Sequence, residues 1–447
     1  MENKENNSQS ISENNQKFDQ NERTEKGFIN RITKTIALVL CFVLTFVGGY
    51  FSRYIFDRKE ISKTNDVVRL IEKFGYVLDE DGNLRDLTPA DYAKALADGL
   101  LDQHSEYYTK EEYESLKSEK SGNRTGFGFS IYVSEDVPPV INKVMGNSPA
   151  DKGGFRVGDM INSANIEGEE SVHFTNSQEL SDFLSICPSD KKVTFNISRG
   201  SENVTIELQR DFYKTSYVIY FDSERKMSLG SNGVLPTPVE YPQEKMDLPA
   251  DTALIKILNF EGAVALQLNV ALQYMQQQGR TKLILDLRDN GGGYMDDLCD
   301  VAEQLIYNGG KKTLIAYARG KNDSESFYIK SEKNNSFITK ISVLANDGTA
   351  SASECLIGAM LHYGERFSLD NLVVEKKQDG VARTYGKGIM QTTYLLLDGS
   401  AMKLTTAKVL WPDKTTCIHL KGILPNPENA TEKGESAVLR AVAILQD

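Results

Sequence analysis

A serine within a run of small residues is a feature of this 447-residue sequence that could carry covalent chemistry. The segment 347–354 reads DGTASASE and leads into an apolar helical pattern, which places Ser351 at the start of a helix. Backbone N–H groups point outward at such an end, and the helix dipole favours developing negative charge. Ser351 could therefore attack a carbonyl carbon while the N–H of Ala352 binds the oxyanion. The alternative is that Ser351 or Ser353 only caps the helix.

A lysine between two glycines, Lys387, precedes the run TTYLLL at 392–397 and is expected at the start of a strand. Because side chains alternate along a strand, Lys387, Ile389 and Gln391 would share one face. Burial would lower the pKa of Lys387 and make it a general base for a serine. Gln391 could orient its amine by hydrogen bonding. The alternative is a solvated surface lysine, which is the usual situation for this residue type.

A glycine-rich loop follows a third pattern, the buried strand in 282–288 (KLILDLR). The segment 286–293 reads DLRDNGGG, and glycines let backbone N–H groups approach a substrate closely. This loop and the serine turn both follow strands, and open α/β sheets build their sites at the carboxyl ends of strands. Gly292 is thus a candidate second oxyanion donor, and an ordinary strand-to-helix turn is the alternative.

A fourth loop, Gly126–Phe129, alternates glycine with phenylalanine before a β-type run. The N–H groups of Phe127, Gly128 and Phe129 could bind a terminal carboxylate, and the peptide would then add as a strand to the sheet edge. The aromatic rings would provide apolar walls for the last side chain of that peptide.

The elements that must position these residues fall into distinct regions of an α/β and α+β multidomain chain. Residues 60–121 show helical spacing, with Thr88 as an N-cap and Pro89 at the first helical position. Residues 122–211 contain short β-type runs and one helix. Residues 251–447 alternate strands with helices, which predicts a parallel or mixed sheet covered by helices. Residues 212–250 hold several prolines and no clear period, and are expected to be a connector.

The N-terminal region predicts a membrane anchor. Residues 1–34 begin with a polar segment that cannot bury enough apolar surface to fold alone. Residues 35–56 follow as an apolar stretch whose uncharged part, Thr35 to Ser52, reaches the lower limit for a membrane-spanning helix. A core helix would be amphipathic, and a cleaved signal peptide would end in a small-residue site. We therefore expect a single uncleaved transmembrane helix.

The composition argues against two classes of function. The formal net charge is −12, and no block of Lys and Arg indicates a nucleic-acid surface. None of the five cysteines forms a C-x-x-C pair, the four histidines are scattered, and no H-E-x-x-H is present, so we expect no metal and no cofactor. Cys355, close to Ser351, is interpreted as a small buried hydrophobic residue.

Taken in order, these segments resemble the carboxy-terminal processing peptidases, also called tail-specific proteases, over residues 64–440. The resemblance rests on DGLLDQHSEYYT, GFGFSI, SPADKGGFRVGDMI, DLRDNGGG, GTASASE, YGKGIMQ and LTTAKVLWPDKTTCIHLKGILPN. It implies a PDZ domain at 122–211 and a serine protease domain at 251–447. It also implies Ser351 as nucleophile, Lys387 as general base, Gln391 as its support, and oxyanion donors at Ala352 and Gly292.

The resemblance further implies substrates bound by their C-termini, a homodimer, and a catalytic domain on the extracytoplasmic side of the cell membrane. Thr349 replaces a serine common in the family, and the loop at 376–385 and the connector at 215–250 are longer than usual. Two rivals remain. A catalytically silent PDZ adaptor would lack the Ser, Lys or Gln, and all three are present. A His–Asp–Ser protease would need a histidine in a site-building context, which none of the four occupies.

Overall fold

The computed structural model describes residues 64–74, 77, 84–120, 123–230, 237–241, 246–330, 333 and 335–447. The chain divides into two compact units, Met1–Tyr92 and Ala93–Asp447. The tail expected at 1–34 and the anchor expected at 35–56 lie outside the described residues. Of the helices within the described ranges, none is long and apolar enough to cross a membrane.

The expected helical segment at 60–121 contains helices over 64–74, α2 (Pro89–Leu100) and α3 (Lys110–Lys120). Helix α2 begins at Pro89, and the Thr88 hydroxyl accepts a hydrogen bond from the Asp91 N–H at 3.3 Å, as the capping pattern predicted. The segment also contains a strand that was not expected, β1 (Glu106–Tyr108). It pairs antiparallel with β20 (Ala401–Leu410) near the end of the chain.

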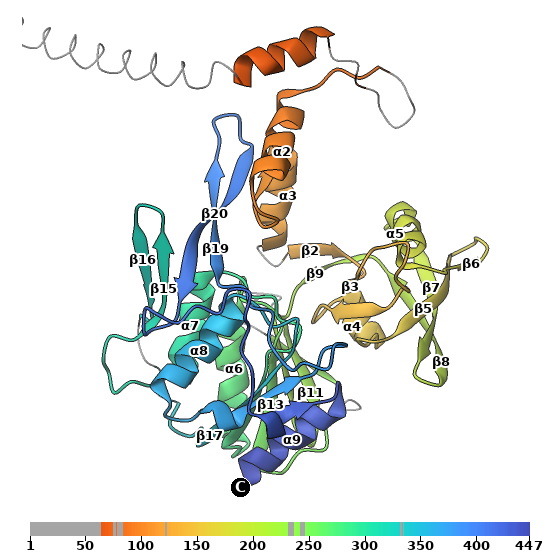
Figure 1. Ribbon diagram of the computed structural model, residues 1–447. Helices are drawn as coiled ribbons and strands as arrows, with labels where there is room; N and C mark the ends of the chain where they lie inside the picture. Colours follow the sequence, from red (N-terminus) through yellow and green to blue (C-terminus); the bar gives the residue numbers. More distant parts are fainter. Residues whose placement is uncertain are drawn as a thin grey trace, which may run out of the picture. The chain divides into compact units, whose positions relative to one another are not determined.

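Residues 123–214 form a small β domain with its own core (Figure 1). Its sheet has the order β6-β5-β7-β8, and β2–β9 and β3–β4 form two short ladders. The ring of Phe195 meets those of Phe127 and Phe155 edge to face at 5.4 and 5.6 Å between centroids. The bounds are β2 Asn123–Gly126, β3 Phe129–Ile131, β4 Ile141–Val144, α4 Pro149–Gly153, β5 Met160–Ile166, β6 Val172–His173, α5 Ser177–Ile186, β7 Lys192–Arg199, β8 Glu202–Gln209 and β9 Asp211–Lys214.

An eight-stranded sheet lies at the centre of the C-terminal domain, in the order β12-β11-β10-β13-β14-β17-β18-β21. The strands from β13 to β21 are parallel, as the strand–helix alternation predicted. Side chains alternate across it: Leu283 and Leu285 pack with α6, α7 and α8, whereas Ile284 packs with α9. These helices are labelled in Figure 1. The bounds are β13 Thr252–Ile257, α6 Val264–Gln277, β14 Lys282–Asp286, α7 Met295–Leu305, β17 Lys340–Ala345, α8 Ala352–Tyr363, β18 Leu372–Glu375, β21 Ala430–Thr431 and α9 Glu435–Gln446.

A second sheet extends from this domain, with β20 paired to β1, β15 and β19 and with β16 beyond β15. Its remaining strands are β15 (Leu314–Gly320), β16 (Ser324–Tyr328) and β19 (Ile389–Leu395). Strand β19 carries the segment that follows Lys387, so this sheet positions the candidate base, whereas the eight-stranded sheet positions the candidate nucleophile.

The structure differs from the connector expected at 212–250, and hence from the 251 boundary. Strands β10 (Val218–Phe221), β11 (Lys226–Gly230) and β12 (Thr237–Tyr241) add an antiparallel edge to the large sheet through β13. Val218 and Tyr220 are completely buried, and Ile219 is 8% exposed. A strand buried on both faces shows no alternation, which is why the segment lacked a recognisable period.

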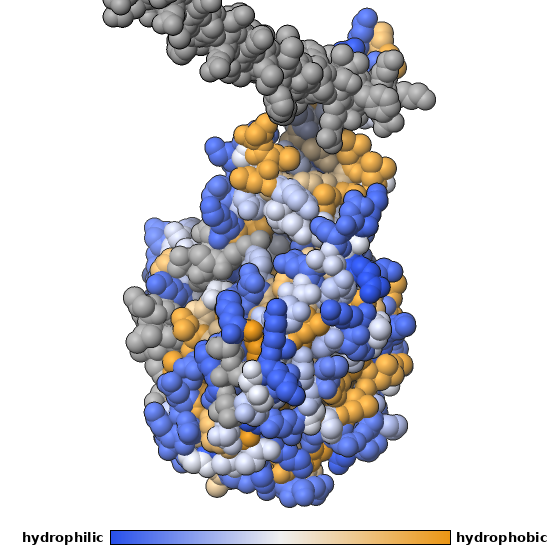
Figure 2. All heavy atoms as spheres, turned by 90° about the vertical axis from the view of Figure 1, so that its left-hand side faces the viewer, coloured by the Kyte–Doolittle hydropathy of each residue, from blue (hydrophilic) through white to orange (hydrophobic). Residues whose placement is uncertain are grey.

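One face of the molecule is mainly polar. Figure 2 shows one face on which hydrophilic residues predominate and hydrophobic side chains are scattered among them. This agrees with a chain that is 26% charged.

Candidate active site

Ser351 lies where the sequence placed it, at the N-terminus of α8 after strand β17. Its backbone has φ 57° and ψ −116°, a left-handed conformation that is costly for a residue with a side chain. Such strain persists only where neighbouring contacts hold it. The hydroxyl of Ser353 is fully buried and donates to the Asn290 carbonyl at 2.9 Å, which makes Ser353 a structural residue and leaves the half-buried Ser351 as the candidate nucleophile.

The carboxylate of Glu354 holds the serine turn in place. It accepts hydrogen bonds from the Ser351 N–H at 2.9 Å and from the Thr384 hydroxyl at 2.5 Å. It also accepts from the N–H groups of Gly386 at 2.8 Å and Lys387 at 2.9 Å. Burial raises the pKa of Glu354 above its ordinary value, while these four hydrogen bonds oppose that shift. Four donors on two oxygens fit the ionised carboxylate.

Glu354 therefore joins the two halves of the candidate site. The Ser351 and Lys387 N–H groups reach the same oxygen, Oε2, at 2.9 Å each, so their nitrogen atoms are no more than twice that distance apart. Our sequence reasoning did not single out Glu354. The signal was present, because Ser351 to Glu354 has the S-x-x-E spacing of a capping box.

Lys387 lies directly before β19, between Gly386 and Gly388. Burial lowers the pKa of its amine, the Lys403 ammonium lowers it further, and the Asp102 carboxylate acts in the opposite direction. Within the described part of the chain, no hydrogen bond of the Lys387 amine is present, and none joins it to the Ser351 hydroxyl. The Lys387 amine is therefore partly desolvated and is not hydrogen-bonded to the candidate nucleophile.

Among the described residues, no hydrogen bond joins Gln391 to Lys387. Its amide Nε2 donates to the Thr405 hydroxyl at 3.0 Å, on the neighbouring strand β20. The pairing of β19 with β20 shifts register between Met390 and Gln391, and such a bulge breaks the alternation on which the shared face was predicted.

The glycine loop meets the serine turn as expected. Gly292 has φ +104°, and a Cβ added there would come within 2.8 Å of the Ser351 Cβ and 2.9 Å of the Ala352 nitrogen. The Gly292 N–H donates to the Asn290 side-chain oxygen at 2.9 Å. The Ala352 N–H has no acceptor among the described residues. The Ala352 N–H is thus available to bind an oxyanion. The Gly292 N–H must first break its hydrogen bond with Asn290.

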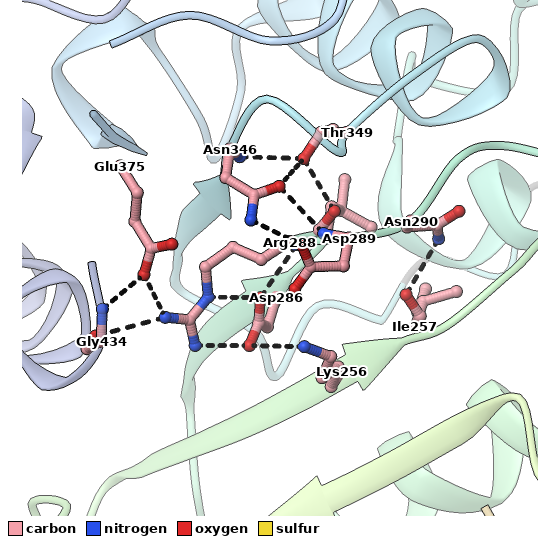
Figure 3. A network of polar contacts seen from close by, with 11 residues as sticks. Lys256, Ile257, Asp286, Arg288, Asp289, Asn290, Asn346, Thr349, Glu375 and Gly434 are labelled. Atoms are coloured by element: carbon pink, nitrogen blue, oxygen red, sulfur yellow. Dashed lines mark hydrogen bonds and ion pairs between the residues drawn. The ribbon is translucent and has the colours of Figure 1, made fainter. Parts of the chain in front are cut away.

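A polar network supports this loop at the carboxyl end of β14 (Figure 3). Arg288 forms two hydrogen bonds with the buried Asp286 carboxylate, at 2.9 and 2.7 Å, and contacts Glu375 at 2.7 Å. Asp289 accepts from the Asn346 amide at 2.8 Å and joins the loop to the segment before Ser351. Paired charges at this depth stabilise the loop only because each has several partners.

The β-domain loop Gly126–Phe129 has the backbone freedom expected of a carboxylate-binding loop. Gly128 has φ +86°, and a Cβ there would come within 2.0 Å of the Ser148 Cβ, so only glycine fits. The Phe127 ring is 6% exposed and packs in the domain core, which differs from the expected role as a wall for a bound peptide. Phe129 is half-buried against Phe155.

Cys355 is buried, as interpreted from the sequence, and burial raises the pKa of its thiol to about 12. It is therefore a neutral thiol and no competitor of Ser351 as a nucleophile. Within the described ranges, no group of three or more His, Cys, Asp or Glu residues could hold a metal ion.

Comparison with known proteins identifies both domains. Residues 251–428 match the model of peptidase family S41, and residues 115–198 match that of the PDZ domain. The chain is 28% identical over 391 residues to a "Probable CtpA-like serine protease" of Staphylococcus aureus (strain COL), a match that covers 85% of this chain and 67% of that protein. A protein of the same name from Staphylococcus epidermidis is 30% identical over 339 residues, covering 75% of this chain and 60% of the relative.

Two solved structures are similar over most of the chain. The photosystem II D1 C-terminal processing protease is 22% identical, with a TM-score of 0.46, and covers 80% of this chain and 86% of its own. An S41 protease from Bacteroides fragilis is 15% identical, with a TM-score of 0.48, and covers 84% of this chain and 95% of its own.

Replacing Glu354 by Gln should disrupt the site while preserving side-chain volume. An NH₂ group would then face N–H or O–H donors, and each buried donor left unpaired costs about 1–3 kcal/mol. We expect Glu354→Gln to lower the free energy of unfolding by about 2–5 kcal/mol. Peptide cleavage should fall by about 100-fold, since a small misplacement of reacting groups has that effect. Denaturant unfolding and kcat/KM measure the two effects.

The control is Glu365→Gln, an exposed carboxylate just beyond the same helix. It should leave both quantities unchanged. Wild-type turnover in Glu354→Gln would mean that this carboxylate does not hold the reacting groups in position.

Proposed function

Since this chain is a PDZ-containing C-terminal processing peptidase with a serine protease domain of family S41, we propose that Ser351 and Lys387 form its catalytic pair. The observation that carries the proposal is the Glu354 carboxylate, which binds the backbone N–H of both residues through the same oxygen. A Ser–Lys pair needs its two members on separate segments held at a fixed spacing.

In the proposed reaction, the neutral amine of Lys387 accepts the hydroxyl proton as the Ser351 oxygen attacks the carbonyl carbon of a peptide bond. The Ala352 N–H stabilises the oxyanion, joined by the Gly292 N–H once it leaves Asn290. Lys387 then donates its proton to the departing amine, which leaves an acyl-enzyme on Ser351. Water hydrolyses the ester, again with Lys387 as base. Gln391 would have to rotate away from Thr405 to support the amine.

We propose that the PDZ domain selects substrates by their C-termini. The N–H groups of the loop Gly126–Phe129 would bind the terminal carboxylate, and the peptide would add as a strand beside β3. Because Phe127 is buried in the core, the pocket for the last side chain is formed by residues other than this ring.

The anchor at 35–56 is likewise a proposal. A single membrane-spanning helix there would attach the enzyme to the cell membrane with residues 57–447 on the extracytoplasmic side. The motive is an 18-residue uncharged stretch, Thr35 to Ser52, preceded by Lys26, Arg31 and Lys34 on its short side. A homodimer is the oligomeric state that the family resemblance implies.

Removing either member of the pair should abolish cleavage without unfolding the domain. We expect Ser351→Ala and Lys387→Ala each to lower kcat/KM by at least about 1000-fold, because members of a nucleophile–base unit fail together. The backbone contacts of Glu354 that hold the two segments remain in both variants, so thermal unfolding should be almost unchanged. Degradation of an unstructured protein by the full chain is the assay, and substantial turnover in Lys387→Ala would exclude it as the base.

The pH dependence of cleavage should follow the amine of Lys387. The pKa of the Lys387 amine lies below the ordinary value of a lysine. As the pH rises and the amine loses its proton, kcat/KM should increase along a rising limb and reach its plateau at a pH below that ordinary value. Lys403 donates to Tyr108 Oη at 2.8 Å and to Glu106 at 3.1 Å. These hydrogen bonds fix the position of the Lys403 charge, which lowers the pKa of Lys387. Lys403→Gln removes a charge that disfavours protonated Lys387, so the limb should move to higher pH.

Lys403→Arg is the matched variant and should keep the wild-type limb, because it retains the positive charge. Identical profiles for Lys403→Gln and the wild type would show that Lys387 is not the titrating base.

Recognition of the substrate terminus should be visible with amidated peptides. Amidation removes the terminal charge that the loop Gly126–Phe129 would bind, so it should lower kcat/KM by about tenfold or more, the effect of losing a charge-assisted hydrogen bond. Acetylating the other end of the same peptide is the control and should change little. Equal cleavage of free-acid and amidated peptides would exclude carboxylate reading by the PDZ domain.

A further inference from the structure

A cavity of about 550 Å³ lies beside Lys387, on the side lined by residues that the proposed reaction does not use. Three segments form its walls. Residues 102–104 precede β1, residues 383–389 carry Lys387 itself, and residues 419–420 belong to the loop after β20. Backbone contacts hold these segments together: the Leu420 N–H donates to the Gly386 carbonyl at 2.8 Å, and Gly388 lies against His419.

Two polar groups on these walls, one buried and one exposed, lack a partner among the described residues. The Nδ1 atom of His419 is buried and has no hydrogen bond. Arg383 also lines the cavity; it is exposed, and its guanidinium has no acceptor within the described part of the chain. The buried His419 nitrogen needs water or a ligand to supply its missing hydrogen bond, whereas Arg383 stays hydrated until a ligand covers it.

The cavity offers both donors and acceptors. Arg383 can only donate, and Asp102 accepts from the Ser105 hydroxyl at 2.8 Å while its carboxylate retains further accepting capacity. The pKa of His104 is lowered by burial first and by the Lys387 charge second, with Asp102 opposing, so its ring is neutral and can donate at one nitrogen. A ligand that matches these walls must itself donate and accept.

We propose that this cavity is a substrate subsite that takes a carboxamide side chain, Asn or Gln, close to the scissile bond. The inference rests on the proposed function, because Lys387 must lie at the scissile bond for the cavity beside it to receive a substrate side chain. An amide oxygen can accept from Arg383, and an amide NH₂ can donate to Asp102 or to the His419 ring. An apolar side chain would leave these groups desolvated and unpaired.

A carboxylate side chain is excluded as the preferred ligand by two charges. Asp102 on the cavity wall would repel it. It would also favour the protonated form of Lys387, since an opposite charge within about 4–6 Å raises the pKa of an amine by about one unit or more. A Glu residue could therefore bind through Arg383 but would delay the reaction until higher pH. The neutral amide gains the hydrogen bonds without this cost.

The test uses the full chain and a peptide of known cleavage site with a constant C-terminal tail. Each of the three positions on either side of the scissile bond carries Gln, Glu or Met in turn, side chains of similar length. We expect one position at which Gln exceeds Met in kcat/KM by about tenfold, the effect of one or two hydrogen bonds. At that position, the Glu peptide should be cleaved with a kcat limb about one pH unit higher than that of Gln.

Arg383→Met should remove the preference for Gln over Met at that position, with little change for the Met peptide. Lys377→Gln is the matched control, because it removes one exposed positive charge from the same loop outside the cavity wall. It should retain the preference. Equal cleavage of the Gln and Met peptides at every position, or a preference that survives in Arg383→Met, would overturn the subsite.

The same experiment separates failure of the subsite from failure of the catalytic assignment. Cleavage that disappears in Ser351→Ala but shows no side-chain preference overturns only the subsite. Cleavage that persists in Ser351→Ala overturns the catalytic pair, and with it the placement of the subsite beside that pair.

Discussion

The buried carboxylate of Glu354 is the contact on which the geometry of the site depends. It lies in the first turn of α8 and accepts from donors at both the serine turn and the 384–387 loop. A buried charge is tolerated only when its oxygens are fully hydrogen-bonded. Separating the two segments would leave that charge unpaired, so the spacing between Ser351 and Lys387 is enforced by desolvation rather than by a direct bond between them.

Buried polar contacts also hold the glycine loop in place. Strands β14 and β17 are parallel neighbours, so the turns that follow them meet at one edge of the sheet. Asp289 with φ 62° and Ser351 with φ 57° both occupy the left-handed region, where a side chain is costly. Hydrogen bonds with Asn346 hold Asp289, and Glu354 holds the Ser351 N–H, while Arg288 pairs with Asp286 and Glu375 beside them (Figure 3). The serine turn and the glycine loop are each held by several hydrogen bonds. The Gly292 N–H has one partner, the Asn290 side chain, and is the group that can change partner.

Local signals in the sequence predicted what local forces determine. Thr88-Pro89 predicted the start of α2, and the small residues at 347–354 placed Ser351 at a helix N-terminus. Contacts between segments that are distant in sequence could not be predicted. The partners of Glu354 lie some thirty residues away, although its capping-box spacing was visible. A register shift between Met390 and Gln391 interrupts the strict alternation on which a shared face was predicted, and a strand buried on both faces at Val218–Phe221 showed no period.

The pairing of β1 with β20 constrains the order in which the protein folds. The ammonium of Lys403 and the carboxylate of Glu106 meet across 297 positions of the chain. Contacts of such separation form slowly, and during synthesis β1 emerges long before its partner exists. The segment bearing His104, which forms one wall of the cavity beside Lys387, is therefore left without its sheet until the chain is almost complete. A polypeptide that ends before residue 401 lacks this pairing partner, so the cavity wall formed by residues 102–104 acquires its sheet only at the last stage of assembly.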